Sequence, residues 1–217
     1  MLPGDYNIYK CPECEHLISV PTLMSGNTFG GKSYSDGKMI APMMPSYPDI
    51  SKCPKCKTIY WLDQKHLLER VHPCEMIYKW SDVKEARFLT INDLFVALNK
   101  GLAQEQDGLS DEHKRELELR IQIWWGYNDR MRKDKPMWRN DRDEVRWKEN
   151  CLRLSKLLEQ SDVPNHKVML ADVKRNLGDF EGCVATINSI DDRRLDWLKE
   201  RFTEECGKGN RWVFEFE

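Results

Sequence analysis

The sequence has no long apolar run and no excess of one charge. None of its stretches approaches the roughly 18 apolar residues that a membrane-spanning helix needs. Its 34 Lys and Arg face 36 Asp and Glu, which gives a formal net charge of -2, so no overall positive field attracts nucleic acid. The N-terminus also lacks a basic stretch followed by an apolar one. We therefore expect a cytoplasmic protein of bacterial origin that does not contact a membrane.

The chain also lacks a recognisable set of catalytic residues. No Ser-His-Asp series, no paired-carboxylate site and no open metal site can be singled out. With 217 residues, 40% hydrophobic composition and 8 Trp, the chain can form one medium domain or a small module joined to a larger one. We predict a globular protein that is not an enzyme.

The composition changes along the chain. Prolines and glycines, counted together, lie mostly before about Trp61, in a region with few helix-forming runs that predicts turns and short strands. From about Thr90 onward, apolar residues recur every three or four positions, which indicates amphipathic helices. We predict an α+β fold with a small N-terminal zinc-ribbon domain over residues 1–80, a mostly α-helical domain over 81–217 and a short C-terminal strand.

Two Cys-x-x-Cys pairs give the strongest signal in the sequence. They read CPEC at 11–14 and CPKC at 53–56, and in each a proline with a fixed dihedral follows the first cysteine and favours a tight turn. In a reducing compartment such pairs are metal ligands more often than disulfides. Zinc takes four thiolates in a tetrahedron. We predict one structural Zn²⁺ held by Cys11, Cys14, Cys53 and Cys56.

This pattern departs from a simple zinc ribbon in two ways. Glu15 and Lys57 stand where a glycine usually follows the second ligand, and the 38 residues between Cys14 and Cys53 form an unusually long connector. We expect an elaborated loop that carries its own strands or an ordered excursion. Four thiolates leave no open position for water, so zinc catalysis is not expected. Lysines near the ligands are expected to offset the negative site: Lys10, Lys52, Lys55 and Lys57.

The connector contains a match to a phosphate-binding loop. Residues 26–33 read GNTFGGKS and satisfy G-x-x-x-x-G-K-[ST]. A working phosphate loop needs a buried strand before it and a helix after it, because the helix N-terminus supplies amides and a dipole. Here Pro42, Pro45 and Pro48 follow, and they exclude a regular helix. We interpret the segment as a Gly-rich hairpin or loop and keep nucleotide binding through Lys32 as a less favoured alternative.

Apolar stripes predict the helices of the C-terminal part. The stripes are Leu94, Leu98 and Leu102; Leu117, Ile121, Trp124, Asn128 and Met131; Trp147, Cys151, Leu154 and Leu158; Met169, Val173 and Leu177; and Leu195, Leu198, Phe202 and Cys206. Residues 211–216 near the C-terminus, RWVFEF, predict an extended strand with three aromatics on one face. A lone strand is unstable, so it must dock elsewhere.

The same region is rich in tryptophan and holds three further cysteines. Trp124, Trp125, Tyr127, Trp138 and Trp147 lie among arginines, and we favour a core role for these aromatics over a binding groove. Outside the two pairs, the cysteines at 74, 151, 183 and 206 lie far apart in sequence. Three of them fall near helical apolar positions and are interpreted as small buried hydrophobes.

Residues 165–190 have the pattern of a tetratricopeptide helical hairpin. Ala171 and Cys183 occupy the small-residue positions of the two helices, and Gly178 and Phe180 belong to the connecting turn. An ordinary helical bundle remains the alternative.

Five segments together carry a wider resemblance: YKCPEC, SGNTFGGKSYSDGK, APMMPSYP, KCPKCKTIYW and LGDF. The chain resembles bacterial proteins of uncharacterised function that couple a zinc ribbon to tetratricopeptide-like helices. The resemblance implies the metal site and the layout, and it implies no reaction or substrate. We therefore expect a zinc-stabilised adaptor that binds another protein. A nucleic-acid-binding zinc ribbon involving Lys52, Lys55 and Lys57 is the alternative.

Overall fold

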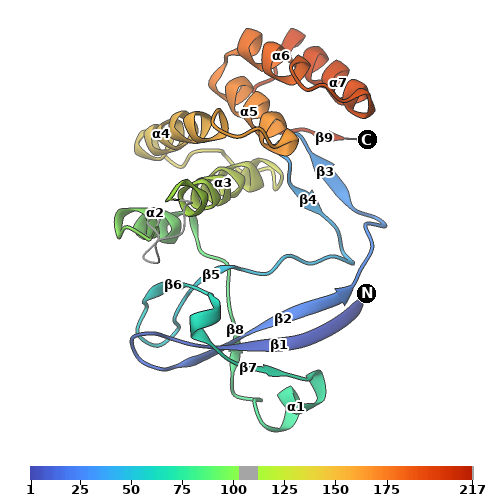
Figure 1. The fold of residues 1–217 in the computed structure, drawn as a ribbon. Helices are drawn as coiled ribbons and strands as arrows, with labels where there is room; N and C mark the ends of the chain where they lie inside the picture. The colour runs from blue at the N-terminus through green and yellow to red at the C-terminus, as the bar shows by residue number, and fades with distance from the viewer. Residues whose placement is uncertain (103–111, 217) are drawn as a thin grey trace. The chain divides into compact units, whose positions relative to one another are not determined.

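The computed structural model describes residues 1–102 and 112–216, which form two compact units (Figure 1). The first unit comprises residues 1–31 and 40–97, and the second comprises residues 32–39 and the chain from Leu98 onward. The predicted α+β class is confirmed, with strands in the N-terminal part, seven α-helices among the described residues and a C-terminal strand. Compared with the predicted ranges 1–80 and 81–217, the first unit extends to Ala97, and the second gains a segment of the connector between the cysteine pairs.

Among the described residues, the first unit contains two separate sheets, one mixed and one antiparallel. One has the strand order β7-β1-β2-β8 and the other pairs β5 with β6, and only β8 runs parallel to its neighbour. The strands are β1 (Leu2–Lys10), β2 (Leu17–Ser25), β5 (Ile50–Lys52), β6 (Ile59–Trp61), β7 (Leu67–Val71) and β8 (Lys84–Glu85). Helix α1 (Pro73–Tyr78) lies between β7 and β8 in the chain, and α2 (Ile91–Asn99), whose residues 91–97 belong to the first unit, follows β8.

This region contains the predicted short strands, but β1 and β2 are longer, with nine residues each. Their prolines are tolerated because the pairing is irregular around Pro3, and because β8 pairs with β2 only at Ile18 and Ser19, away from Pro21. Ile8 and Ile18 are buried. These contacts outweigh the low strand propensity of the prolines.

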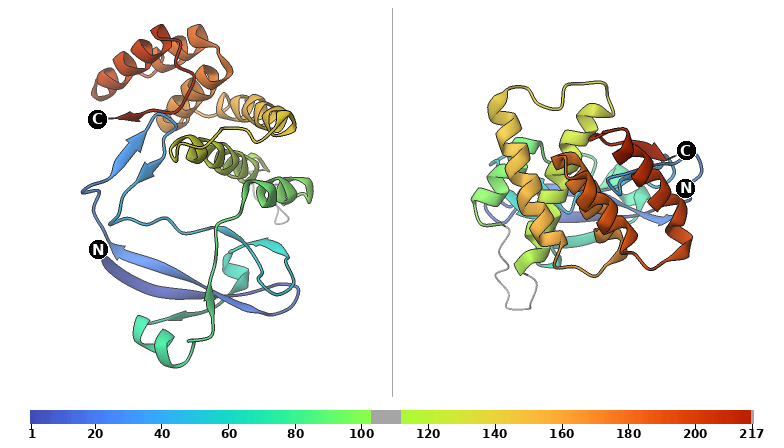
Figure 2. Two further views of the ribbon diagram at one scale, coloured as in Figure 1. Left: turned by 180° about the vertical axis from the view of Figure 1, so that it is seen from behind. Right: turned by 90° about the horizontal axis from the view of Figure 1, so that it is seen from above.

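The second unit is built from five α-helices that pack one after another. Each helix packs against the next one along the chain, as Figure 2 shows from above. The helices are α3 (Glu112–Met131), α4 (Asp141–Leu158), α5 (Pro164–Leu177), α6 (Phe180–Asn188) and α7 (Asp196–Gly207). The predicted stripes are confirmed where the side chains are buried, as at Leu154 and Leu198, and Trp124 and Trp147 belong to the core.

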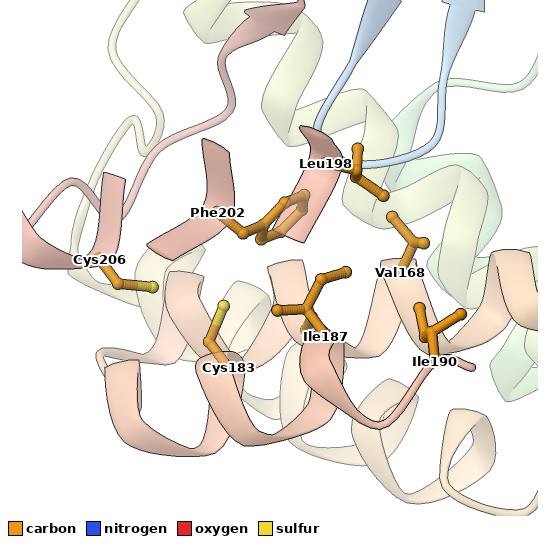
Figure 3. Packing of buried hydrophobic residues seen from close by; sticks show 8 residues of the cluster. Val168, Cys183, Ile187, Ile190, Leu198, Phe202 and Cys206 are labelled. Atoms are coloured by element: carbon orange, nitrogen blue, oxygen red, sulfur yellow. The ribbon is translucent and has the colours of Figure 1, made fainter. Parts of the chain in front are cut away.

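The last three helices share a hydrophobic core (Figure 3). Val168 of α5, Ile187 of α6 and Phe202 of α7 meet there, and the sulfurs of Cys183 and Cys206 point toward one another. Both cysteines are buried, as is Cys151 in α4, so the prediction that they act as small hydrophobes is confirmed. None of the described helices combines the length and apolar composition needed to cross a membrane.

The C-terminal strand docks on the connector between the cysteine pairs. Strand β9 (Glu215–Phe216) pairs antiparallel with β3 (Lys32–Tyr34), in a sheet of order β4-β3-β9 whose remaining strand is β4 (Met39–Ile40). On the other side, Phe214 and Phe216 pack against the ring of Phe202. The strand therefore gains both backbone partners and an aromatic core, as a two-residue strand requires.

Residues 32–39, called the inserted hairpin below, are an internal part of the second unit. Ser35 and Asp36 at its turn are fully buried. The Asp36 carboxylate accepts hydrogen bonds from Asn128 (2.8 Å) and from the guanidinium of Arg132, and the Asp36 carbonyl accepts one from Trp125 Nε1 (3.0 Å). These buried partners satisfy a charge that would otherwise be very costly to bury.

Candidate metal centre

Two turns of the same design hold the four cysteines of the first unit. The turn at Cys11 and Cys14 joins β1 to β2, and the turn at Cys53 and Cys56 joins β5 to β6. In the first, the amide of Glu15 donates to the Cys11 carbonyl (3.0 Å) and the amide of Cys11 donates to the His16 carbonyl (2.9 Å). In the second, Lys57 and Thr58 make the equivalent bonds with Cys53, at 3.0 and 2.8 Å. The two turns therefore present their sulfurs in the same way.

The residue after each second cysteine adopts a left-handed conformation. Glu15 has φ 58° and Lys57 has φ 66°. An L-residue with a Cβ costs roughly 1–2 kcal/mol in this region, which is why glycine usually occupies the position. Glu15 and Lys57 therefore adopt the turn conformation that glycine usually adopts at this position.

Relief of this strain gives a testable prediction. Lys57→Gly is expected to stabilise the first unit by about 0.5–1 kcal/mol, because the left-handed strain outweighs the extra chain entropy of glycine and the exposed hydrogen bond from Lys57 Nζ to the Pro54 carbonyl. Lys55→Gly is the matched control. It removes the same charge at a position outside the left-handed region, so it is expected to destabilise. Melting temperatures of the two variants should move in opposite directions, and a fall for both would contradict the strain argument.

The sulfur positions fit a metal ion better than disulfides. All four Sγ atoms lie within 4.8 Å of one another. The distances from Cys11 to Cys56 and from Cys14 to Cys53 are both 3.6 Å. A tetrahedron with metal–sulfur bonds of about 2.3 Å has edges of about 3.8 Å, whereas a disulfide bond is about 2.05 Å long. The four predicted ligands are therefore brought together closely enough to hold one metal ion.

The site has a buried side and an exposed side. Cys11 and Cys53 are buried with Ile18 and Tyr60, while Cys56 is exposed. Burial raises the pKa of the Cys11 thiol to about 12, and hydrogen bonds with the Thr58 hydroxyl and amide lower the pKa of Cys56 to about 6. A metal ion that binds must displace the Cys11 proton, so its binding is linked to pH.

The centre also joins two sheets. In the described part of the chain, β5 and β6 pair with each other and not with the β7-β1-β2-β8 sheet. The sulfurs come in equal number from a turn of each sheet, and Ser51 Oγ adds a hydrogen bond to the Arg87 carbonyl (3.0 Å). A metal ion here would tie together two hairpins that share no strand.

Several of the predicted basic neighbours have protein partners of their own. Lys10 pairs with Glu15 at 2.7 Å, and Lys52 pairs with Asp93 at 2.8 Å. Their charges are thereby partly offset, which reduces their value for binding a phosphate backbone.

The residues of the phosphate-loop match lie in a different setting from that of a nucleotide site. Lys32 begins the strand β3, so a strand and not a helix follows the glycines. Its Nζ lies 2.9 Å from Glu215, and this hydrogen-bonded pair raises the pKa of the lysine. The helix N-terminus that would orient a phosphate is thus missing at this position.

Comparisons with known proteins found no relatives of this chain. No family model matches it, and neither the curated proteins nor the solved structures contain a significant match. Sequence reasoning found the four cysteines but missed Thr58 as a partner of Cys56, and it missed the buried Asp36 cluster. A threonine two residues beyond a cysteine was the available signal for the first, and the second depends on contacts distant in sequence.

Proposed function

We propose that the four cysteines hold a structural zinc ion and that the protein is a non-catalytic adaptor for another protein. The observation that carries the proposal is the close approach of four cysteine sulfurs, all within 4.8 Å of one another, because a shell of four thiolates favours zinc and has no open position for a substrate. The zinc would stabilise the N-terminal domain as a ribbon with an elaborated loop. In this proposal the protein acts in the cytoplasm.

The helical unit is the part proposed to bind the partner, and α5 and α6 are proposed to form a tetratricopeptide-like hairpin. Several features support this interpretation. Ala171 and Cys183, at the small-residue positions, are both fully buried. Gly178 ends α5 in a left-handed conformation with φ 89°, and the Asp179 side chain caps α6 through the amide of Gly182 (2.8 Å). Stacked helical hairpins generally offer extended surfaces to protein partners.

Cross-linking in cells tests the adaptor proposal. The full-length chain serves as bait, and cross-linked peptides are mapped by mass spectrometry. A single partner protein cross-linked through α3 to α7 is the expected result. The nucleic-acid alternative would instead be favoured by binding of an oligonucleotide with a steep salt dependence. That binding would have to be lost when Lys52, Lys55 and Lys57 are replaced by Gln.

A further inference from the structure

The inserted hairpin has an unusual position in the order of the chain. It belongs to the second unit, yet it lies in sequence between the two cysteine pairs of the first. The chain therefore leaves the first unit after Gly31, contributes the hairpin to the second unit, and returns at Ile40 before it reaches Cys53. The hairpin is therefore a loop whose two flanking ends, Gly31 and Ile40, both belong to the unit that holds the metal ligands.

The first unit holds these two ends together. A Cβ atom built on Gly31 would lie 3.2 Å from the Cβ of Ala41, and Ala41 is buried. The amide of Gly31 donates to the Thr28 carbonyl at 2.8 Å, which fixes the outgoing chain at the same place. When the first unit is folded, the base of the hairpin is thus already closed.

The tip of the hairpin is fixed in the second unit by buried polar contacts. The Asp36 carboxylate accepts hydrogen bonds from Asn128 in α3 and from Arg132, the residue directly after α3. Ser35 Oγ accepts a hydrogen bond from Arg175 of α5 at 3.2 Å. The amide of Phe214 donates to the same Ser35 oxygen (3.2 Å). If the hairpin leaves, these buried groups on two helices and on the C-terminal segment lose their partners, so the second unit needs the hairpin in order to stay closed.

We propose that the metal centre stabilises the helical unit through the inserted hairpin, so that loss of the metal loosens a unit that contributes none of the ligands. This inference rests on the proposed metal binding. When the first unit is folded, docking the hairpin requires only a short, already closed loop. When the first unit is unfolded, docking must also close the flexible chain from 40 to 97. The probability that a flexible loop closes falls roughly as the 3/2 power of its length. The equilibrium constant for docking of the hairpin should therefore fall by a factor on the order of ten when the first unit unfolds.

Buried thiols in the helices provide a readout for this coupling. Cys151 and Cys183 are fully buried in α4 and α6, so they react with a thiol reagent only when the second unit opens. The full chain is prepared with zinc and, separately, stripped with a chelator under a phosphine reductant. Each sample receives timed pulses of N-ethylmaleimide, and peptide mass spectrometry reports labelling at each cysteine. The exposed Cys74 serves as the internal reference.

Stripping is expected to accelerate labelling of Cys151 and Cys183 about tenfold or more relative to Cys74, and added zinc is expected to restore the slow rate. If the N-terminal cysteines become reactive while Cys151 and Cys183 keep their rates, the coupling is refuted and the metal proposal stands. If the purified chain takes up no zinc, the metal proposal and the coupling fail together.

Two variants test the route of the coupling. Asp36→Asn weakens the buried contacts that hold the hairpin in the second unit. Cys151 and Cys183 of this variant should therefore react quickly with N-ethylmaleimide even in the zinc-loaded protein. The ratio of the labelling rate in stripped protein to that in loaded protein should fall toward one. Ser33→Ala changes an exposed residue of the same hairpin and should keep the wild-type ratio. An unchanged ratio in Asp36→Asn would show that the units communicate by another route or not at all.

Discussion

Cys53→Ser is expected to abolish stable zinc binding and to unfold the first unit. Cys53 is fully buried, and its sulfur lies 3.6 Å from that of Cys14 in the partner turn. The hydroxyl of serine is a poor zinc ligand, so a three-thiolate shell should lose most of its affinity. Binding of structural zinc supplies about 10–16 kcal/mol in isolated zinc modules, which exceeds the total stability of most small domains.

The measurement is elemental mass spectrometry of the purified protein together with circular dichroism melting. Wild type should contain about one zinc per chain, and Cys53→Ser should contain almost none and lose its β-sheet signal. Cys74→Ser is the matched control, because Cys74 is exposed and outside the cluster, and it should keep both properties. Equal metal content and equal melting in all three proteins would refute the metal assignment and favour a purely packed core.

The clustering of the four cysteines was predictable because its information is local. A Cys-Pro-x-Cys turn determines its own shape, and two copies of one turn complete one tetrahedral shell. The same holds for α4, where the periodic burial of Trp147, Cys151 and Leu154 follows from spacing along one helix. Neither inference requires knowledge of which segments meet in space.

The burial of the inserted hairpin was not predictable for the opposite reason. Its sequence indicated a Gly-rich hairpin or loop within an elaborated connector, and nothing local to Ser35 and Asp36 shows that both are buried. Their partners, such as Arg132 and Arg175, lie about 100 or more residues away along the chain. Polar residues at a turn are usually solvated, so residue propensity does not predict that these two are buried. The place where β9 docks was missed for the same reason.

Arg175→Met is the second change expected to have a large effect, a loss of about 3–5 kcal/mol in the stability of the helical unit. The Arg175 side chain is fully buried and forms an ion pair with Asp172, which is also fully buried. It donates to the carbonyl oxygens of Asn210 (2.6 Å) and Trp212 (2.8 Å), and its guanidinium lies 4.7 Å from the centre of the Phe214 ring. Methionine fills much of the same volume but leaves a buried carboxylate and two carbonyls without these donors.

The pH dependence separates a stranded charge from a packing defect. Burial raises the pKa of Asp172, and removal of the arginine is expected to raise it further, since the cation favours the ionised carboxylate. A carboxyl whose pKa is higher in the folded state than in the unfolded state lowers the stability of the protein at any pH above its unfolded-state pKa. The cost disappears at lower pH, where the carboxyl is protonated in both states. The deficit of Arg175→Met should therefore be largest near neutral pH, shrink as the pH falls toward about 4, and lose its charge-dependent part below that pH. A cavity alone would give a deficit that is independent of pH.

Two further variants complete this test in urea unfolding experiments at several pH values. Asp172→Asn combined with Arg175→Met removes the stranded charge, so it should recover part of the stability at pH 7 and lose the pH dependence. Arg194→Met breaks the pair with Asp192, in which the Arg194 side chain is 89% exposed, and it should leave the unfolding midpoint unchanged within error. A deficit of equal size in Arg175→Met and Arg194→Met would mean that the buried network contributes no more than a surface ion pair. In that case the C-terminal segment would have to be held by its aromatic contacts with Phe202 instead.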